Sequence, residues 1–223
     1  MKEFFTNMFE DMTEMTVGGW VLLALLLSGG VVTFLLLRKK AGKPFWTART
    51  MSVGAMCMAL ASVLSLIKLL PMPMGGSLTP ASMLPLLLFA YVYGTVPGLT
   101  LGAVYGVMQF ILDGGQFLWT GLIPNLLDYP IAFGLLGLAG CFNKLENERK
   151  GLALGFLLGC FGRFAASFTS GVVFYAEWAP EGMHPIVYSA GYNAMYMLPE
   201  CLLCIGIGIF VAPRLVRQLR RVK

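Results

Sequence analysis

An acidic residue lies in the middle of a long apolar stretch of this chain, where an ionised group is costly and needs a reason to be there. Asp128 is near the centre of the apolar run 118–142. Asn125 precedes Asp128 by three residues and Tyr129 by four, so a helix places all three on one face. A carboxylate beside aromatic rings suits an organic cation, because the carboxylate neutralises its charge and the rings attract it. The sequence therefore predicts a site for a small cationic molecule, with Asp128 as counter-ion.

Two further apolar runs, 151–176 and 184–212, carry hydroxyl, amide and aromatic groups at helical spacing. If the runs alternate in direction, these groups lie level with Asp128, about 15 Å below the outer surface. This pattern predicts a pocket that opens outward between three helices. The residues concerned are Ser167, Ser170, Gly171, Phe174 and Tyr175 in the first run, and Tyr188, Tyr192, Asn193 and Tyr196 in the second. An alternative stays open for the serines and Asn193, which would then only bond one another between helices.

The other charged residues in these runs are expected to lie deeper. No Lys or Arg is expected at the depth of Asp128, which leaves that carboxylate alone. Arg163 and Glu200 are expected to form a structural ion pair between the runs 151–176 and 184–212.

The sequence contains no set of residues typical of an enzyme. The serines have no intramembrane histidine as a base, no helix carries an HExxH zinc pair, and the GxxxxGK[ST] phosphate loop is missing. We expect no catalytic site, cofactor or metal, and ATP-driven transport would require a separate ATPase.

The elements that position these residues are strongly apolar. Hydrophobic residues make up 57% of the chain and charged residues only 12%, whereas a soluble domain carries about 25% charged residues. Lipid must therefore surround most of the chain, and lipid cannot satisfy free backbone groups, so the runs are expected to be helices. We predict an all-α membrane protein with seven spans, at about 18–37, 48–70, 81–96, 97–113, 118–142, 151–176 and 184–212.

Basic residues set the predicted orientation. Lys and Arg gather after the first span, in the loop 143–150 and in the tail 214–223, whereas the opposite loops carry Asp113, Glu177 and Glu181. Basic loops remain in the cytoplasm, so we expect a multi-pass plasma-membrane protein with its N-terminus outside and its C-terminus in the cytoplasm. The net charge of +5 then needs no nucleic-acid partner.

Glycine recurs every fourth residue at 98, 102 and 106 and again at 151, 155 and 159. This spacing lines one face of a helix with glycine and predicts close approach of neighbouring helices. The outer loop 70–80 has Gly and Pro at its hinges and is expected to cover the pocket.

Four stretches together resemble a known family. They are Gly54-Ala55-Met-Cys-Met-Ala59-Leu-Ala61, Gly75-Gly76-Ser77 running into Met83-Leu84-Pro85, Leu127-Asp128-Tyr129, and Gly171 with Pro185-Ile-Val-Tyr188 and Asn193. Residues 48 to about 213 resemble the S component, the substrate-binding subunit, of energy-coupling factor vitamin transporters, closest to the thiamine-specific type.

The resemblance implies a six-helix bundle that binds thiamine in an outward pocket and delivers it with a transmembrane coupling protein and ATPase subunits. It implies that Ala55 and Ala59 contact the coupling protein. It assigns the ligand to Asp128, Tyr129, Ser167, Gly171, Tyr175, Trp178, Tyr188 and Asn193. The expected organisation is an extra N-terminal helix and basic linker in 1–47, the bundle in 48–213 and a basic cytoplasmic tail in 214–223.

The chain departs from this family at three points. The family has Glu at the position of Asp128 and His at the position of Ser167, and it has no counterpart of the first span. A shorter acid and a lost imidazole change the pocket, so a related organic cation stays open as ligand. Two other functions also stay open: a stand-alone proton-coupled secondary transporter that uses Asp128, and a structural membrane protein that binds no small molecule.

Overall fold

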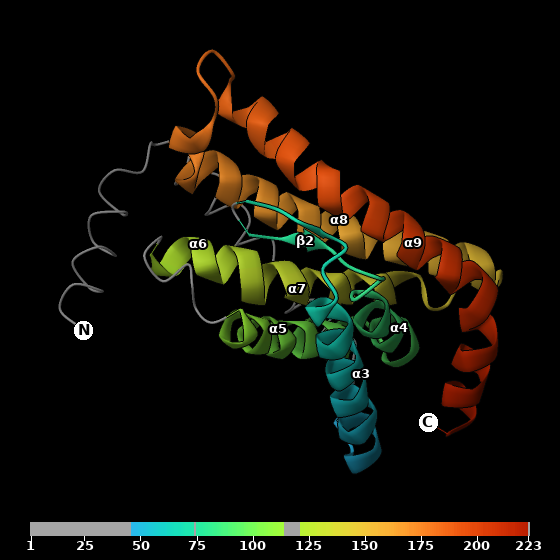
Figure 1. Ribbon diagram of the computed structural model, residues 1–223. Coiled ribbons are helices and arrows are strands. Elements are labelled where there is room, and N and C mark those ends of the chain that lie inside the picture. The colour runs from blue at the N-terminus through green and yellow to red at the C-terminus, as the bar shows by residue number, and fades with distance from the viewer. Residues whose placement is uncertain (1–45, 74, 114–120, 223) are drawn as a thin grey trace.

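The chain folds into a bundle of apolar helices. The computed structural model describes residues 46–73, 75–113 and 121–222, and the predicted first span lies outside them. The elements in chain order are α3 (Ala48–Leu66), β1 (Leu70–Pro71), β2 (Ser77–Leu78), α4 (Leu84–Tyr93), α5 (Thr95–Leu112), α6 (Leu122–Leu126), η2 (Leu127–Ile131), α7 (Ala132–Leu135), η3 (Leu136–Phe142), α8 (Glu148–Phe174), η4 (Ala176–Trp178) and α9 (Pro185–Val222) (Figure 1).

Helices dominate the described part of the chain, which confirms the prediction of an all-α membrane protein. Within it, five helical stretches are long and apolar enough to cross a membrane. The helix α4 is shorter than the predicted span 81–96, since it has 10 residues and rises about 15 Å. Gly94 ends it with a φ of 104°, a conformation that favours glycine, and α5 begins at the next residue, two residues earlier than predicted.

The predicted span 118–142 forms a helix with an irregular middle. From Leu122 to Phe142 it runs as α6, the π-helical turn η2, α7 and the 3₁₀ stretch η3. Pro130 lies inside η2; proline has no backbone N–H and crowds the preceding turn. A π turn at such a point often marks a functional position, and here it carries Asp128 and Tyr129.

The two glycine series hold this irregular span between them. A Cβ atom at Gly102 on α5 would meet the backbone of Phe133, and one at Gly106 would meet the backbone of Tyr129. On the opposite side, a Cβ atom at Gly155 on α8 would meet the carbonyl oxygen of Ala139. The predicted close approach is confirmed, and both neighbours of the span contact its main chain directly.

The helices α8 and α9 lie side by side, and α3 projects from the bundle (Figure 1). On α3 only a narrow strip packs inward, where Gly54 lies against Phe89 and Leu101. Met56 and Leu60 are 71% and 54% exposed, so most of the apolar surface of α3 has no partner among the residues that the structure describes. The helix α9 continues past residue 213 into the predicted tail, and Arg217 Nε lies 3.5 Å from Glu148 Oε2 at the start of α8.

Candidate functional site

A cavity of about 260 Å³ lies between α5, η2, α8, α9 and the β1–β2 hairpin. The structure brings together every residue predicted to contact the ligand. All eight line this cavity: Asp128, Tyr129, Ser167, Gly171, Tyr175, Trp178, Tyr188 and Asn193. The lining also extends beyond the three predicted helices, since the hairpin and the end of α5 contribute to it.

The carboxylate of Asp128 is tied to the neighbouring helix. Ser170 on α8 is fully buried, and its hydroxyl donates a hydrogen bond to Asp128 Oδ2 over 2.8 Å. This bond fixes one carboxylate oxygen against α8. Asp128 lines the cavity, and an ionised carboxylate can accept further hydrogen bonds beside the one from Ser170.

The amide of Asn193 is held in one orientation by its neighbours. Its Nδ2 donates to the carbonyl oxygen of Ser189 over 3.0 Å, and Tyr196 donates its hydroxyl to Asn193 Oδ1 over 3.0 Å. Ser189 in turn donates to the carbonyl oxygen of Phe168 over 2.9 Å. A Cβ atom at Gly171 would meet Ser189 Oγ, so glycine there lets α8 and α9 approach closely beside the amide.

The tyrosines of α9 form the predicted stripe along the cavity. The ring of Tyr192 lies 5.9 Å from that of Tyr188 and 6.3 Å from that of Tyr196, measured between centroids. Tyr192 donates its hydroxyl to the carbonyl oxygen of Gly75 over 2.8 Å. This bond joins α9 to the hairpin, so the loop expected to cover the pocket is attached to one of its walls.

Two further aromatic positions, Tyr129 and Trp178, differ in exposure. Tyr129 is half-buried, donates its hydroxyl to Asp113 Oδ2 over 3.2 Å, and meets Phe110 edge to face. Trp178 lies in η4 between α8 and α9 and is 49% exposed. Tyr129 therefore belongs to the wall of the cavity and Trp178 to its rim.

The expected ion pair between Arg163 and Glu200 does not form. Glu200 is buried and accepts hydrogen bonds from the hydroxyls of Thr79 and Ser82, over 2.6 and 2.8 Å. The loop before α4 brings these hydroxyls to α9 from more than a hundred residues away, a contact that helical spacing does not reveal.

Arg163 is the functional candidate that the sequence analysis did not identify. Its guanidinium carbon lies 4.1 Å from the centre of the Phe133 ring, and its Nε and Nη1 are buried without a hydrogen-bond partner. It lines the same cavity as Asp128, which corrects the expectation that no basic residue lies beside that acid. The sequence feature that could have identified it is an arginine inside an apolar run. The sequence analysis attributed this arginine to an ion pair with Glu200.

Asp128 is also not the lone carboxylate of the site. Glu200 and Asp113 line the cavity with it, and Lys68 Nζ lies 3.9 Å from Asp113 Oδ1. The cavity is therefore polar and of mixed charge. Ala55 and Ala59 lie away from it, exposed on the projecting helix α3.

Comparisons with known proteins agree with one family. The model of the family described as thiamine transporter protein matches residues 51–219. The thiamine transporter ThiT of Bacillus subtilis (strain 168) is 33% identical over 162 residues, which cover 67% of this chain and 83% of that protein. The thiamine transporter ThiT of Lacticaseibacillus paracasei is 32% identical over 149 residues, 60% of this chain and 73% of that protein.

A solved structure supports the same fold. The structure of ThiT from Listeria monocytogenes superposes with a TM-score of 0.63 at 22% identity, covering 75% of this chain and 96% of that one. The relatives are named as transporters rather than enzymes. On the matched family, the relatives and the shared helical architecture, the chain belongs to the thiamine transporter family of S components of energy-coupling factor transporters.

Proposed function

We propose that this chain binds thiamine in the described cavity and takes part in its uptake. The observation that carries the proposal is a carboxylate, Asp128, held by Ser170 at the wall of a cavity rich in aromatic rings. Thiamine carries a fixed positive charge on its thiazolium ring. An ionised Asp128 on the cavity wall attracts this cation, and a contact between the two inside the cavity is stronger than in water because it is shielded from solvent.

The aromatic residues supply the second part of the recognition. The rings of Tyr129, Tyr175 and Tyr188 line the cavity, with Trp178 at its rim. Each desolvated contact between a ring and the cation contributes about 0.5–2 kcal/mol. Ser167, Gly171 and Asn193 complete the wall formed by α8 and α9.

Arg163 fits the other half of the ligand. The aminopyrimidine ring of thiamine offers ring nitrogens that accept hydrogen bonds. Arg163 lines the cavity and brings a positive charge to it. A ligand acceptor beside the guanidinium would form a charge-assisted contact with it.

Delivery needs partners outside this chain. The sequence has no phosphate-binding loop for ATP, so we propose that a coupling protein with ATPase subunits supplies the energy. The exposed face of α3 with Ala55 and Ala59 is the proposed contact, since small residues let a partner helix approach. Uptake of thiamine by the purified chain alone in liposomes would instead support a stand-alone secondary transporter.

Calorimetry of the purified full chain with thiamine tests the ligand. Asp128→Asn keeps the shape and removes the charge, and should cost about 2–5 kcal/mol of binding free energy, which corresponds to roughly 30- to several-thousand-fold in Kd. The matched control is Glu181→Gln, which neutralises an exposed carboxylate outside the cavity. The proposal fails if thiamine gives no heat while a neutral vitamin binds equally to the parent chain and to Asp128→Asn.

A further inference from the structure

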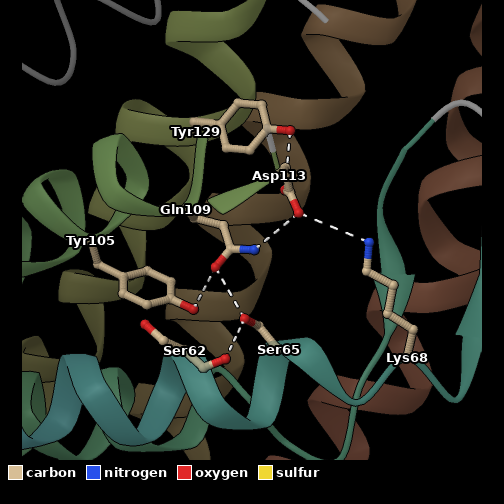
Figure 2. A network of polar contacts seen from close by, with 7 residues as sticks. All are labelled: Ser62, Ser65, Lys68, Tyr105, Gln109, Asp113 and Tyr129. Carbon is tan, nitrogen blue, oxygen red and sulfur yellow. Dashed lines mark hydrogen bonds and ion pairs between the residues drawn. The ribbon is translucent and has the colours of Figure 1, made fainter. Parts of the chain in front are cut away.

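A chain of hydrogen bonds joins the wall of the cavity to the end of the projecting helix α3 (Figure 2). Tyr129 donates to Asp113 Oδ2 over 3.2 Å, and Gln109 Nε2 donates to Asp113 Oδ1 over 3.4 Å. The Ser65 hydroxyl is shared between two acceptors, the carbonyl oxygen of Ser62 at 2.8 Å and Gln109 Oε1 at 3.2 Å. We call Tyr129, Asp113, Gln109 and Ser65 the relay; it crosses from η2 through α5 to the last turn of α3.

The chemistry of the relay fixes its direction. The carboxylate of Asp113 only accepts hydrogen bonds, so the amide nitrogen of Gln109 must face it. The amide oxygen of Gln109 then receives the hydroxyls of Ser65 and, over 3.0 Å, of Tyr105. Gln109 is buried. It has an acceptor, Asp113, on one side and hydroxyl donors on the other, and its amide satisfies both because it donates and accepts.

The two ends of the relay lie on the π turn η2 and on the last turn of α3. Tyr129 lies in the π turn next to Asp128 and lines the cavity. Ser65 is in the last turn of α3, just before Lys68, whose Nζ lies 3.9 Å from the same Asp113 carboxylate. Ser65, Gln109 and Asp113 line the same cavity as Tyr129, so the last turn of α3 is itself part of the cavity wall. The relay therefore runs along that wall to a helix whose outer surface has no partner among the described residues.

We propose that Gln109 and Asp113 are positioning residues that transmit occupancy of the cavity to the position of α3. The inference rests on the proposed function, since it takes thiamine as the occupant. A cation bound at Asp128 changes the environment of the neighbouring Tyr129 hydroxyl, and Asp113 then redistributes its bonds between Gln109 and Lys68. Coupling of this kind is reciprocal, so a partner docked on α3 changes the affinity for thiamine by the same factor.

Distance measurements between spin labels test the coupling. Labels at Met56→Cys on α3 and Leu157→Cys on α8 occupy exposed positions outside the cavity, in a full-length chain whose natural cysteines are replaced by alanine. The distance distribution is recorded without thiamine and with saturating thiamine, and calorimetry on the same samples reports binding. With the relay intact, thiamine should shift the distribution.

A pair of serines on α3 provides the matched comparison. Ser65→Ala removes the bond to Gln109 together with a bond inside α3, to the carbonyl oxygen of Ser62. Ser62→Ala removes only a bond inside α3, to the carbonyl oxygen of Met58, so it controls for the loss of an intrahelical bond. The shift caused by saturating thiamine should be lost in Ser65→Ala and kept in Ser62→Ala. Gln109→Met, which keeps the length and removes both polar ends, should lose it as well; if that variant does not fold, the serine pair decides.

The outcomes separate the two proposals. Thiamine binding without any shift in the intact chain overturns the relay and leaves the proposed function standing. An equal shift in Ser65→Ala and Ser62→Ala also overturns the relay. Absence of thiamine binding in the intact chain overturns both the function and the inference that depends on it.

Discussion

At the scale of single residues, Arg163 and Asp128 place opposite charges on one small cavity. Their surroundings differ in a way that matters for a ligand. Asp128 already accepts a hydrogen bond from Ser170, whereas two nitrogens of Arg163 have no partner among the described residues. An incoming molecule therefore gains most where it offers acceptors to Arg163 and positive charge to Asp128.

Replacement of Arg163 by Met should separate affinity from stability. The variant keeps much of the apolar stem but removes the donors, so thiamine affinity should fall about 10- to 100-fold, for a loss of about 1.5–3 kcal/mol in charged hydrogen bonds. The stability of the folded protein should change little, because removing two buried donors that lack hydrogen-bond partners offsets the lost contact of the guanidinium with the Phe133 ring. Calorimetry and thermal unfolding in detergent measure the two effects, with the exposed Arg149→Met as control. A stability loss with unchanged affinity would show that Arg163 is structural.

The residue types of the site were predictable, but their partners were not. Asp128, Tyr188 and Asn193 were found because polar groups recur at helical spacing inside apolar runs. The partner of Glu200 was missed, because Thr79 and Ser82 reach it from a loop whose path the spacing does not encode. The relay was missed for the same reason, because Gln109 lies unremarked inside the predicted span 97–113 and Asp113 was expected only as an acidic residue of an outer loop.

At the scale of elements, close backbone contact contributes to holding the helix that carries Asp128. Gly102 on α5 lets that helix approach closely, whereas a Cβ atom at Gly191 on α9 would meet nothing within 4 Å.

Two alanine substitutions test this difference. Gly102→Ala should destabilise the protein by about 1–3 kcal/mol, because the new Cβ meets the backbone of Phe133. Gly191→Ala should be neutral or stabilising by up to about 1 kcal/mol, because alanine favours the helix. Thermal unfolding of both variants in the same detergent measures the effect. Similar unfolding temperatures for the two would refute close packing at Gly102.

The projecting helix α3 gives a second prediction at this scale. Ala59→Trp should abolish thiamine uptake in cells and retain thiamine binding, because a bulky ring keeps a partner helix away. Leu60→Trp is the control, since Leu60 is also exposed but lies about 100° around the helix. Uptake assays and calorimetry give the comparison. Loss of binding together with uptake would place the defect inside this chain instead.

The helical spans were predictable because their apolar content is high, and so was a break between the third and fourth spans, which the structure places at Gly94. The π turn at Leu127–Ile131 was not predictable, because hydropathy does not report the local backbone geometry around Pro130.

At the scale of the whole molecule, charge distribution predicts how the protein lies in the membrane. Basic residues in the loop 143–150 and the tail indicate the cytoplasmic side. With the proposed additional helix in 1–47, the N-terminus is then outside.

Labelling of intact cells tests this orientation. A cysteine introduced by Phe5→Cys should react with a membrane-impermeant reagent in intact cells. One introduced by Lys150→Cys should react only after the membrane is opened. The assay uses a background without the natural cysteines. Protection of position 5 until the membrane is opened would reverse the assignment of the N-terminus.

The glycine series on α5 and α8 pack against the helix that carries Asp128. This packing has a consequence for how ligand selectivity can change. Gly102, Gly106 and Gly155 touch that helix through its main chain, so its side chains toward the cavity do not form these contacts. Substitutions at the cavity wall that keep the packing of Tyr129 and Phe133 can then alter what is bound while these main-chain contacts remain. A designer could retune selectivity for other cations at such positions without rebuilding the contacts made by the glycines.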